Sequence, residues 1–248
     1  MKGVILAAGV ASRLRPLTDL VPKCLLEVGG GTILGLTIEN LIANGIADIV
    51  IVTGYRESLI RQYLRDSFPA LDVGFITNDR FATTNNITSL ALAGGAMTGG
   101  EIILLDSDIV FDRRIIGLLT RVGRVSCLAM KSGTALGPEE IKVETGPGNT
   151  VRRIGKDVPP GSAAGESIGI EKLSSEFLRD LSPILERMIR EERGENLFYE
   201  AAFQRAITLG SVLTAVDVGD LHCMEIDTPA DLEAARALCA PAQRPSRS

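Results

Sequence analysis

Apolar runs alternate with amphipathic segments through the first half of the chain. Between the apolar runs, residues 32–45 and 57–68 repeat their apolar positions at intervals of three and four, as helices with one buried face do. Strands that alternate with such helices form mostly parallel sheets covered on both faces. The pattern therefore predicts an α/β fold with a doubly wound sheet. The expected strands are 3–8, 48–54, 73–77, 101–106 and 125–130.

The pattern changes after about residue 140. Two β-rich pieces flank a Gly-Pro-Gly-Asn turn within 141–157, which predicts a short hairpin. Further along we expect a strand over 166–173, helices near 174–192 and 196–209, an edge strand near 211–218, and a strand that runs into a helix within 222–238. We expect one domain over 1–240, with halves 1–130 and 131–240, and a disordered tail over 241–248.

The composition excludes several classes of protein. The chain has 248 residues, 45% of them hydrophobic, which is enough for a sizeable core. A net charge of −5 argues against a broad nucleic-acid-binding face but allows a local basic pocket for a small anion. The first apolar run is far shorter than the ~20 residues of a membrane span, so no membrane association is expected. The cysteines form no CxxC pair, which indicates reduced thiols and a cytoplasmic protein.

The stretch LAAGVASRLRP (6–16) joins the first strand to two arginines through small residues. Ligands of doubly wound sheets bind at the carboxyl ends of strands, and small residues let them approach backbone N–H groups. Arg13 and Arg15 add fixed positive charge, and Lys23 follows a proline that can aim it back at the same pocket. Neither a Walker loop nor G-x-G-x-x-G is present. The stretch predicts a polyphosphate site.

Two acidic pairs with i, i+2 spacing each follow a strand-like run. Asp106 and Asp108 follow the run 101–106, and Glu225 with Asp227 follows the last strand. Carboxylates at this spacing on extended chain point the same way and suit a cation. Solvated loop aspartates explain the first pair equally well, and Asp227 could belong to the cap of the following helix.

Residues 2–30, KGVILAAGVASRLRPLTDLVPKCLLEVGG, resemble the signature L-A-A-G-x-G-[ST]-R-[LM]-x-P-L-T…P-K-x-L. The signature belongs to nucleotidyltransferases that join an NTP to a phosphorylated small molecule and release pyrophosphate. The resemblance implies a Rossmann-like, GT-A-like nucleotidyltransferase fold with a mixed sheet and a small β-hairpin and helical insertion that binds the acceptor. The half 1–130 would bind the nucleotide and the half 131–240 the acceptor.

The same resemblance implies roles for individual residues. Arg13 and Lys23 would face the phosphates as catalytic groups, and the nucleotide would contact the loop residues Leu6, Ala7, Ala8 and Gly9. Ala11 replaces the second glycine of the family; if that position needs positive φ, alanine is strained by roughly 1 kcal/mol. Asp108 and Asp227 would bind Mg²⁺, with Glu225 as a possible third ligand and Asp106 on the nucleotide side.

ATTNNITSL (82–90) resembles a segment of the choline-phosphate and aminoethylphosphonate cytidylyltransferases that lies near the base and ribose. The resemblance implies nucleotide contacts for Asn85, Asn86 and Ser89, and also for Thr53, Gly54 and Tyr55 at the end of the second strand. The asparagines could equally be helix caps.

Tyr199 and Glu200 align loosely with an aromatic-acidic pair that, in the choline-phosphate branch, faces a quaternary ammonium. An aromatic ring and a carboxylate together do stabilise a cation. Phe198, Tyr199 and Phe203, however, stand at helical spacing and suit a core equally well.

The resemblance implies transfer of a nucleotidyl group, CMP from CTP, to a small phosphate or phosphonate such as phosphocholine, phosphoethanolamine or 2-aminoethylphosphonate. The acceptor oxygen is already largely ionised, with a second pKa of about 6, so no strong base is needed and the lone His222 is expected to be structural. Alternatives are a sugar-1-phosphate or inositol-1-phosphate nucleotidyltransferase, a glycosyltransferase, which would lack the N-terminal signature, and an inactive nucleotide-binding regulatory domain, for which Ala11 argues. The chain could be a monomer or a homodimer.

Overall fold

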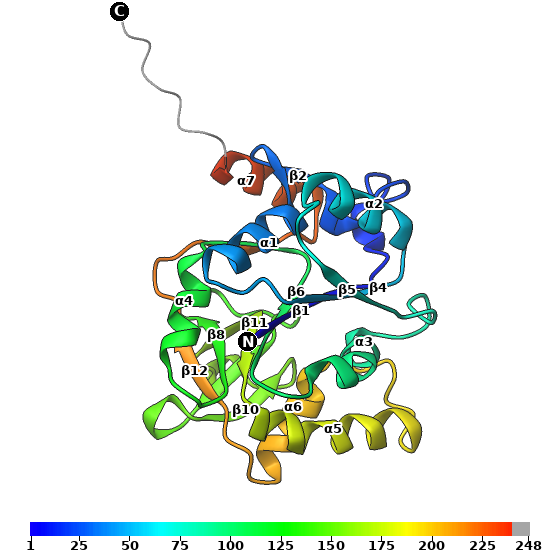
Figure 1. Ribbon diagram of the computed structural model, residues 1–248. Helices are drawn as coiled ribbons and strands as arrows, with labels where there is room; N and C mark the ends of the chain where they lie inside the picture. Colours follow the sequence, from blue (N-terminus) through cyan, green and yellow to red (C-terminus); the bar gives the residue numbers. More distant parts are fainter. Residues whose placement is uncertain (240–248) are drawn as a thin grey trace, which may run out of the picture.

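The computed structural model describes residues 1–239 and contains a nine-stranded mixed sheet (Figure 1). Its parallel part consists of β6 (Ile102–Asp106), β1 (Lys2–Ala7), β4 (Ile49–Thr53) and β5 (Val73–Thr77), side by side in that order. Leu6 pairs with Val52 on one side and with Asp106 on the other, so the carboxyl ends of these strands meet at one edge. The mostly parallel α/β sheet expected from the sequence is confirmed.

An antiparallel part extends the sheet beyond β6. The long strand β11 (Gly165–Leu173) pairs with β6, with β8 (Cys127–Lys131) and with β9 (Lys142–Thr145). β9 and β10 (Val151–Gly155) form the expected hairpin, whose turn contains the 3-10 helix η4 (Pro147–Asn149). β12 (Thr214–Asp217) is the edge strand and runs parallel to β8.

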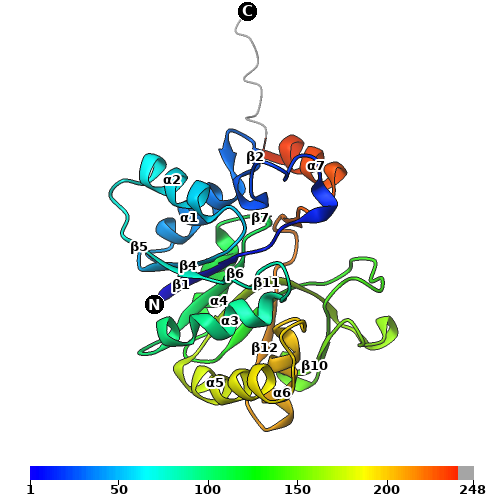
Figure 2. The ribbon, with the colours of Figure 1, turned by 90° about the vertical axis from the view of Figure 1, so that its right-hand side faces the viewer.

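Helices cover both faces of the sheet, as Figures 1 and 2 show. Alternate residues of β1 face opposite sides: Val4 and Leu6 belong to one buried cluster, and Ile5 and Ala7 to the other. The first cluster contains the apolar faces of α3 (Asn86–Leu92), α5 (Ser175–Arg190) and α6 (Glu200–Thr208). The second contains those of α1 (Ile33–Ala43), α2 (Glu57–Ser67) and α4 (Arg114–Arg121).

A small second sheet and the last helix pack against elements from the first half of the chain. β13 (Cys223–Glu225) pairs antiparallel with β7 (Ile109–Phe111), the strand that follows the turn after β6. α7 (Pro229–Cys239) then packs beside the small pair β2 (Glu27–Val28) and β3 (Gly31–Thr32). A third apolar cluster, which includes Leu14, Val110 and Leu232, joins these pieces. The remaining 3-10 helices are η1 (Ser12–Leu14), η2 (Lys23–Leu25), η3 (Ala93–Met97) and η5 (Pro160–Ser162).

The structure differs from the sequence pattern mainly in short elements. β7, the pair β2 and β3, and α4 are not anticipated, because segments of two to eight residues carry too little periodicity to stand out. The helix expected near 196–209 begins only at Glu200, because the backbone before it bonds to the start of α3. The tail expected over 241–248 lies outside the described residues.

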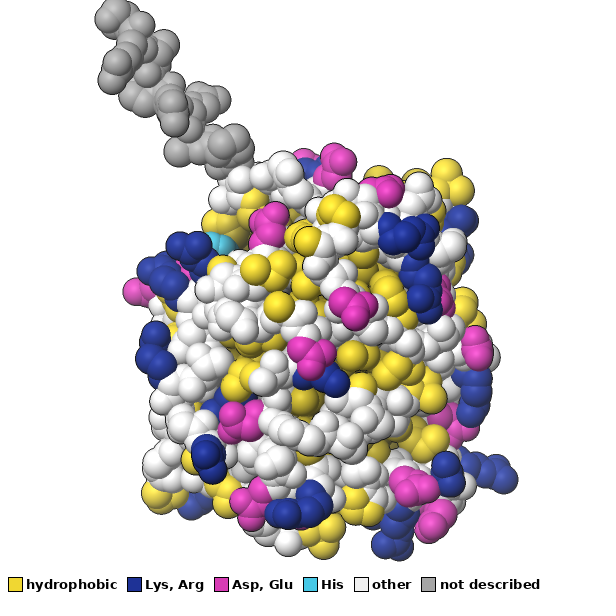
Figure 3. All heavy atoms as spheres, in the orientation of Figure 1, with side chains coloured by type: hydrophobic (Ala, Val, Ile, Leu, Met, Phe, Trp, Pro, Cys, Tyr) yellow, Lys and Arg dark blue, Asp and Glu magenta, His cyan; other side chains and the backbone are white. Residues whose placement is uncertain are grey.

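The surface of the protein carries charged side chains of both signs. On the face in Figure 3, acidic and basic side chains are interspersed among other residues. Over residues 1–239, none of the helices combines the length and the apolar composition that a membrane crossing requires.

Candidate active site

A cleft of about 570 Å³ opens at the carboxyl ends of the parallel strands. Its walls come from the loop after β1, the turn after β6, the start of α3, the 139–141 segment, the start of β11, and β13. Most residues singled out from the sequence lie along this cleft. They are Leu6, Ala7, Ala8, Gly9, Arg13, Lys23, Asn85, Asn86, Ser89, Asp106, Asp108, Glu200, Glu225 and Asp227.

The loop after β1 contains a strained alanine. Ala11 has φ 52° and ψ 54°, the left-handed region that glycine adopts freely and that costs alanine roughly 1 kcal/mol. Its carbonyl accepts hydrogen bonds from the Thr18 hydroxyl at 2.9 Å and from the Leu14 N–H at 3.1 Å. The loop therefore keeps a glycine-like backbone without the glycine. Gly9, which lines the cleft, has open space where a Cβ would lie.

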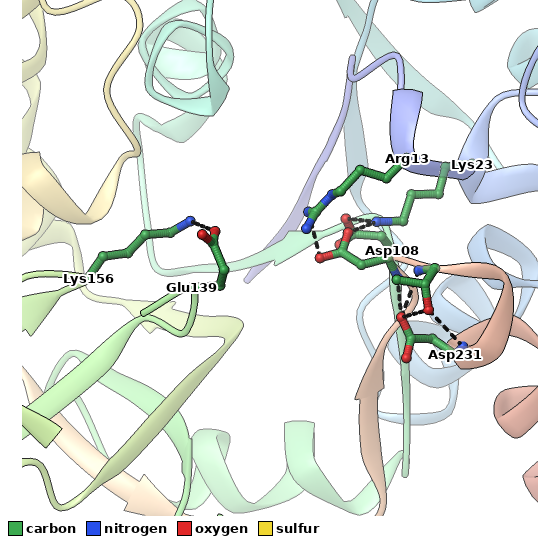
Figure 4. A network of polar contacts seen from close by, with 8 residues as sticks. Arg13, Lys23, Asp108, Glu139, Lys156 and Asp231 are labelled. Carbon is green, nitrogen blue, oxygen red and sulfur yellow. Dashed lines mark hydrogen bonds and ion pairs between the residues drawn. The ribbon is translucent and has the colours of Figure 1, made fainter. Parts of the chain in front are cut away.

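Two basic side chains of the first segment contact the two distant aspartates (Figure 4). Lys23 Nζ lies 2.8 Å from Asp108 Oδ2 and 2.8 Å from Asp227 Oδ1, and Arg13 Nη2 lies 2.7 Å from Asp227 Oδ2. Burial opposes the charged ammonium of Lys23, but the two aspartates outweigh it and raise the pKa of Lys23 above its ordinary value. The segments around residues 13–23, 108 and 227 therefore form one ionic network.

The helix that follows Asp227 is capped by other residues. The Thr228 hydroxyl oxygen accepts a hydrogen bond from the Asp231 N–H at 3.2 Å, and Asp231 Oδ2 accepts the N–H groups of Thr228 and Asp227 at 2.7 and 3.1 Å. This reciprocal arrangement is a capping box. It leaves the Asp227 carboxylate free to point into the cleft, which favours the site interpretation of Asp227 over the cap interpretation.

Glu225 completes a group of three carboxylates. One oxygen from each of Asp108, Glu225 and Asp227 lies within 4.8 Å of the others. Burial and the charges of Asp108 and Asp227 raise the pKa of Glu225 to about 8. Carboxylate oxygens at this spacing suit a hard divalent cation, which would also relieve their mutual repulsion.

Asp106 lies on the floor of the cleft and contacts a buried tyrosine. The Tyr199 hydroxyl lies 3.2 Å from Asp106 Oδ2 and 3.3 Å from each carboxylate oxygen of Glu171. Burial and neighbouring acids raise the pKa of both Asp106 and Glu171 well above their ordinary values. Gly169, at φ 68°, allows β11 to pass this close, because a Cβ there would lie 2.7 Å from Asp106 Oδ2.

Tyr199 is therefore a core residue in this structure. Its ring is fully buried and packs on Phe203 with the ring centroids 5.1 Å apart. Phe198, its neighbour, is 40% exposed and lines the cleft instead. Of the expected aromatic-acidic pair, Glu200 reaches the cleft, whereas the aromatic ring that does so is Phe198.

The middle motif holds α3 to the segment that precedes α6. Asn85 caps α3 by accepting the Asn86 N–H at 2.8 Å, and Asn86 Oδ1 accepts the Tyr199 N–H at 2.9 Å. Ser89 bonds to Asn78, a buried cleft residue that the sequence reasoning missed. Its position directly after β5, at the carboxyl edge of the sheet, is the signal that could have found it.

Thr53, Gly54 and Tyr55 lie behind the first loop and are not among the residues that line the cleft. The Tyr55 N–H donates to the Ala8 carbonyl at 3.1 Å. A Cβ on Gly54 would lie 2.9 Å from that same carbonyl oxygen, so the glycine allows the two loops to touch. A contact of Thr53, Gly54 and Tyr55 with the nucleotide base stays a prediction.

The wall that faces Arg13 and Lys23 across the cleft carries an ion pair that no sequence motif indicated (Figure 4). Lys156 Nζ lies 2.9 Å from Glu139 Oε2 and 4.5 Å from the centre of the Phe198 ring. Glu200 lines the same cleft with only 4% of its surface exposed. Burial raises the pKa of Glu200 to about 7, while its own backbone and the charge of Lys156 act in the opposite direction.

Known proteins resemble this chain in sequence. Residues 2–123 match the family model described as Nucleotidyl transferase. CMP-5'-(3-aminopropyl)phosphonate synthase of Streptomyces rubellomurinus is 27% identical over 238 residues, which cover 93% of this chain and 37% of that protein. Choline-phosphate cytidylyltransferase of Streptococcus pneumoniae is 36% identical over 107 residues, 43% of this chain and 45% of that protein. The chain thus matches less than half the length of each of these two relatives.

A solved structure supports the fold over nearly the whole chain. CTP:phosphocholine cytidylyltransferase from Streptococcus pneumoniae superposes with a TM-score of 0.80 at 23% identity, covering 96% of this chain and 98% of that one. At this level of identity the similarity shows the fold alone.

Proposed function

Because the chain belongs to the nucleotidyltransferase family, we propose that it transfers CMP from CTP to a small phosphate or phosphonate acceptor and releases pyrophosphate. The observation that carries the proposal is the ionic network, in which Lys23 contacts both Asp108 and Asp227 at one cleft. Cations and carboxylates that converge at the carboxyl edge of a parallel sheet suit a polyphosphate and its counter-ion.

Arg13 and Lys23 would bind the phosphates. In the free protein, both side chains are paired with carboxylates. Phosphate oxygens would compete for the same donors, since charge-assisted bonds from arginine and lysine to phosphate are strong. When pyrophosphate leaves, negative charge develops on its oxygens, and these two cations would stabilise that charge.

A divalent cation such as Mg²⁺ fits the carboxylate group. Asp108 and Asp227 would hold it with Glu225 as a third ligand, because their oxygens lie within 4.8 Å of one another and are hard donors. Once bound, such an ion neutralises charge on phosphate oxygens. Lys23 contacts two of these carboxylates, so its ammonium would compete with the ion for them.

The acceptor needs little help from a general base. A phosphate monoester or phosphonate oxygen has a second pKa of about 6 and is mostly ionised at neutral pH. His222 is 43% exposed, lies 3.8 Å from Asp112 and does not line the cleft, which supports a structural role. Positioning and charge neutralisation would therefore supply most of the rate.

The remaining assignments follow from position along the cleft. Leu6 to Gly9, Asn85, Asn86, Ser89 and Asp106 would contact the nucleotide, so residues 1–130 form the nucleotide half and 131–240 the acceptor half. The predicted cytoplasmic location rests on the cysteine pattern. A monomer or a homodimer stays the prediction for the oligomeric state.

A pyrophosphate-release screen tests the proposal. Four NTPs are combined with choline phosphate, phosphoethanolamine, 2-aminoethylphosphonate, glucose-1-phosphate and inositol-1-phosphate. We expect release with CTP and a phosphate or phosphonate acceptor that carries an amine. Turnover restricted to the sugar or inositol phosphates would favour that alternative, and CTP binding in calorimetry without release from any acceptor would favour an inactive regulatory domain.

A further inference from the structure

We call the part of the cleft that is lined by Glu139, Lys156, Phe198 and Glu200 the acceptor end. It carries opposite charges on two different segments. Lys156 directly follows β10, and Glu200 opens α6. We propose that this end binds a zwitterionic tail, so that an ammonium of the acceptor pairs with Glu200 and a carboxylate of the same acceptor pairs with Lys156. The acceptor would then be an amino acid that carries a phosphate or phosphonate. The inference rests on the proposed function for the reaction and adds the class of acceptor.

The charge of Lys156 acts on Glu200, but one oxygen of this carboxylate accepts no hydrogen bond from residues 1–239. That oxygen, Oε2, is buried. Leaving a buried carboxylate oxygen unpartnered costs free energy. A primary or secondary ammonium from a ligand carries N–H donors that would satisfy this oxygen. A quaternary ammonium carries none.

The aromatic surface at this end is already covered by a cation. Phe198 presents its ring to the cleft, and Lys156 Nζ lies 4.5 Å from the centre of that ring. The ring of Tyr199 is fully buried and its hydroxyl is bonded to Asp106, so it offers no free face. A trimethylammonium group would have to share the Phe198 ring with a like charge. The arrangement therefore disfavours choline phosphate.

Lys156 is held towards the cleft but is only loosely paired. Its partner Glu139 has a side chain that is 74% exposed, and ion pairs with such exposed partners are weak. A carboxylate on the acceptor could replace Glu139 at little cost, while the Phe198 ring keeps the ammonium in place. The pair lies across the cleft from Arg13 (Figure 4), whose charge helps to lower the pKa of Glu139 after the larger effect of Lys156.

Matched acceptors test the inference directly. 2-Amino-3-phosphonopropionate is 2-aminoethylphosphonate with a carboxylate on the carbon that bears the amine, and phosphoserine stands in the same relation to phosphoethanolamine. With CTP and Mg²⁺, we expect kcat/KM to be at least about 10-fold higher for the carboxylate-bearing member of each pair, as one added ion pair predicts. Equal values, or a preference for the members without the carboxylate, would overturn the inference.

Variants assign the preference to residues. Lys156→Met should bring the ratio within each pair close to one, and Lys156→Arg should keep most of it. Glu200→Gln should lower kcat/KM for all four acceptors and leave the ratio unchanged. Arg187→Met removes an exposed positive charge on α5, away from the cleft, and should change nothing. If Lys156→Met slows both members of a pair equally, Lys156 contacts the phosphonate instead, and the inference is wrong.

A binding measurement separates this inference from the proposed reaction. Calorimetry with α,β-methylene-CTP measures acceptor affinity without turnover, and thermal unfolding shows whether each variant is folded. Tighter binding of the carboxylate-bearing acceptors without pyrophosphate release from any acceptor would reject the reaction and keep the acceptor class. Release at equal rates from both members of each pair would keep the reaction and reject the acceptor class.

Discussion

The ammonium of Lys23 lies 2.8 Å from a carboxylate oxygen of Asp108, although 85 residues separate them in the chain. The same nitrogen lies equally close to Asp227. The protein therefore pairs two carboxylates of the acidic group with its own cation. A metal ion at these carboxylates would compete with Lys23 for them.

Replacing Asp108 tests the carboxylate group. Asp108→Asn should reduce pyrophosphate release by roughly 1,000-fold, because one of the proposed carboxylate ligands becomes a neutral amide. Circular dichroism should show a folded protein, since the side chain is at the cleft surface. Asp48→Asn, at an exposed aspartate just before β4, is the control and should retain full activity. Near-normal release from Asp108→Asn would remove the metal assignment.

Replacing Lys23 should affect metal binding and turnover in opposite directions. Lys23→Met removes the cation that occupies Asp108 and Asp227, so the protein without nucleotide should bind Mn²⁺ or Mg²⁺ about 10-fold more tightly in calorimetry. Turnover should fall by roughly 100-fold, because the phosphates lose a donor. Unchanged metal affinity in this variant would mean that the ion binds elsewhere.

Ala11 offers a test of backbone strain. Ala11→Val should lower the free energy of unfolding by about 2 kcal/mol, because a β-branched residue tolerates φ 52° poorly. Ala11→Gly should change it by less than about 1 kcal/mol, since relief of strain is offset by the greater freedom of the unfolded chain. Urea unfolding measures both. A valine variant as stable as the wild type would show that the loop adopts another path in solution.

Glu200 should make stability depend on pH. Its pKa in the folded protein is raised to about 7. As the pH rises from the ordinary pKa of a glutamate to 7, Glu200 therefore loses its proton in the unfolded chain but keeps it in the folded protein. The free energy of unfolding of the wild type should therefore fall over this range, relative to Glu200→Gln, by up to roughly 3 kcal/mol, and the difference should stay constant at higher pH. Parallel curves for the two proteins from pH 5 to 8 would show that Glu200 ionises normally.

The sequence was sufficient to predict the strands of the large sheet and most helices, because their apolar periods are long and regular. It also predicted that Arg13, Lys23, Asp108 and Asp227 would be neighbours, and the structure brings these four together. Arg13 and Lys23 lie in the N-terminal signature, and Asp108 follows β6 closely. Asp227, in contrast, reaches them through the pairing of β13 with β7.

The acceptor end could not be predicted in the same way. Whether Tyr199 or Phe198 faces the cleft depends on where α6 begins, and that is set by the hydrogen bond from the Tyr199 N–H to Asn86. Lys156 and Glu139 meet through the β9–β10 hairpin and the loop before it. Such contacts between distant segments leave no periodic trace in the sequence.

The pairing of β13 with β7 has a consequence during synthesis. Asp227 reaches the cleft only after β13 has paired with β7. The helix α7, which follows Asp227, packs against β2 near the start of the chain. A nascent chain halted before β13 would hold an incomplete charge cluster, because Asp227 would be missing. The cluster would therefore be completed late in translation.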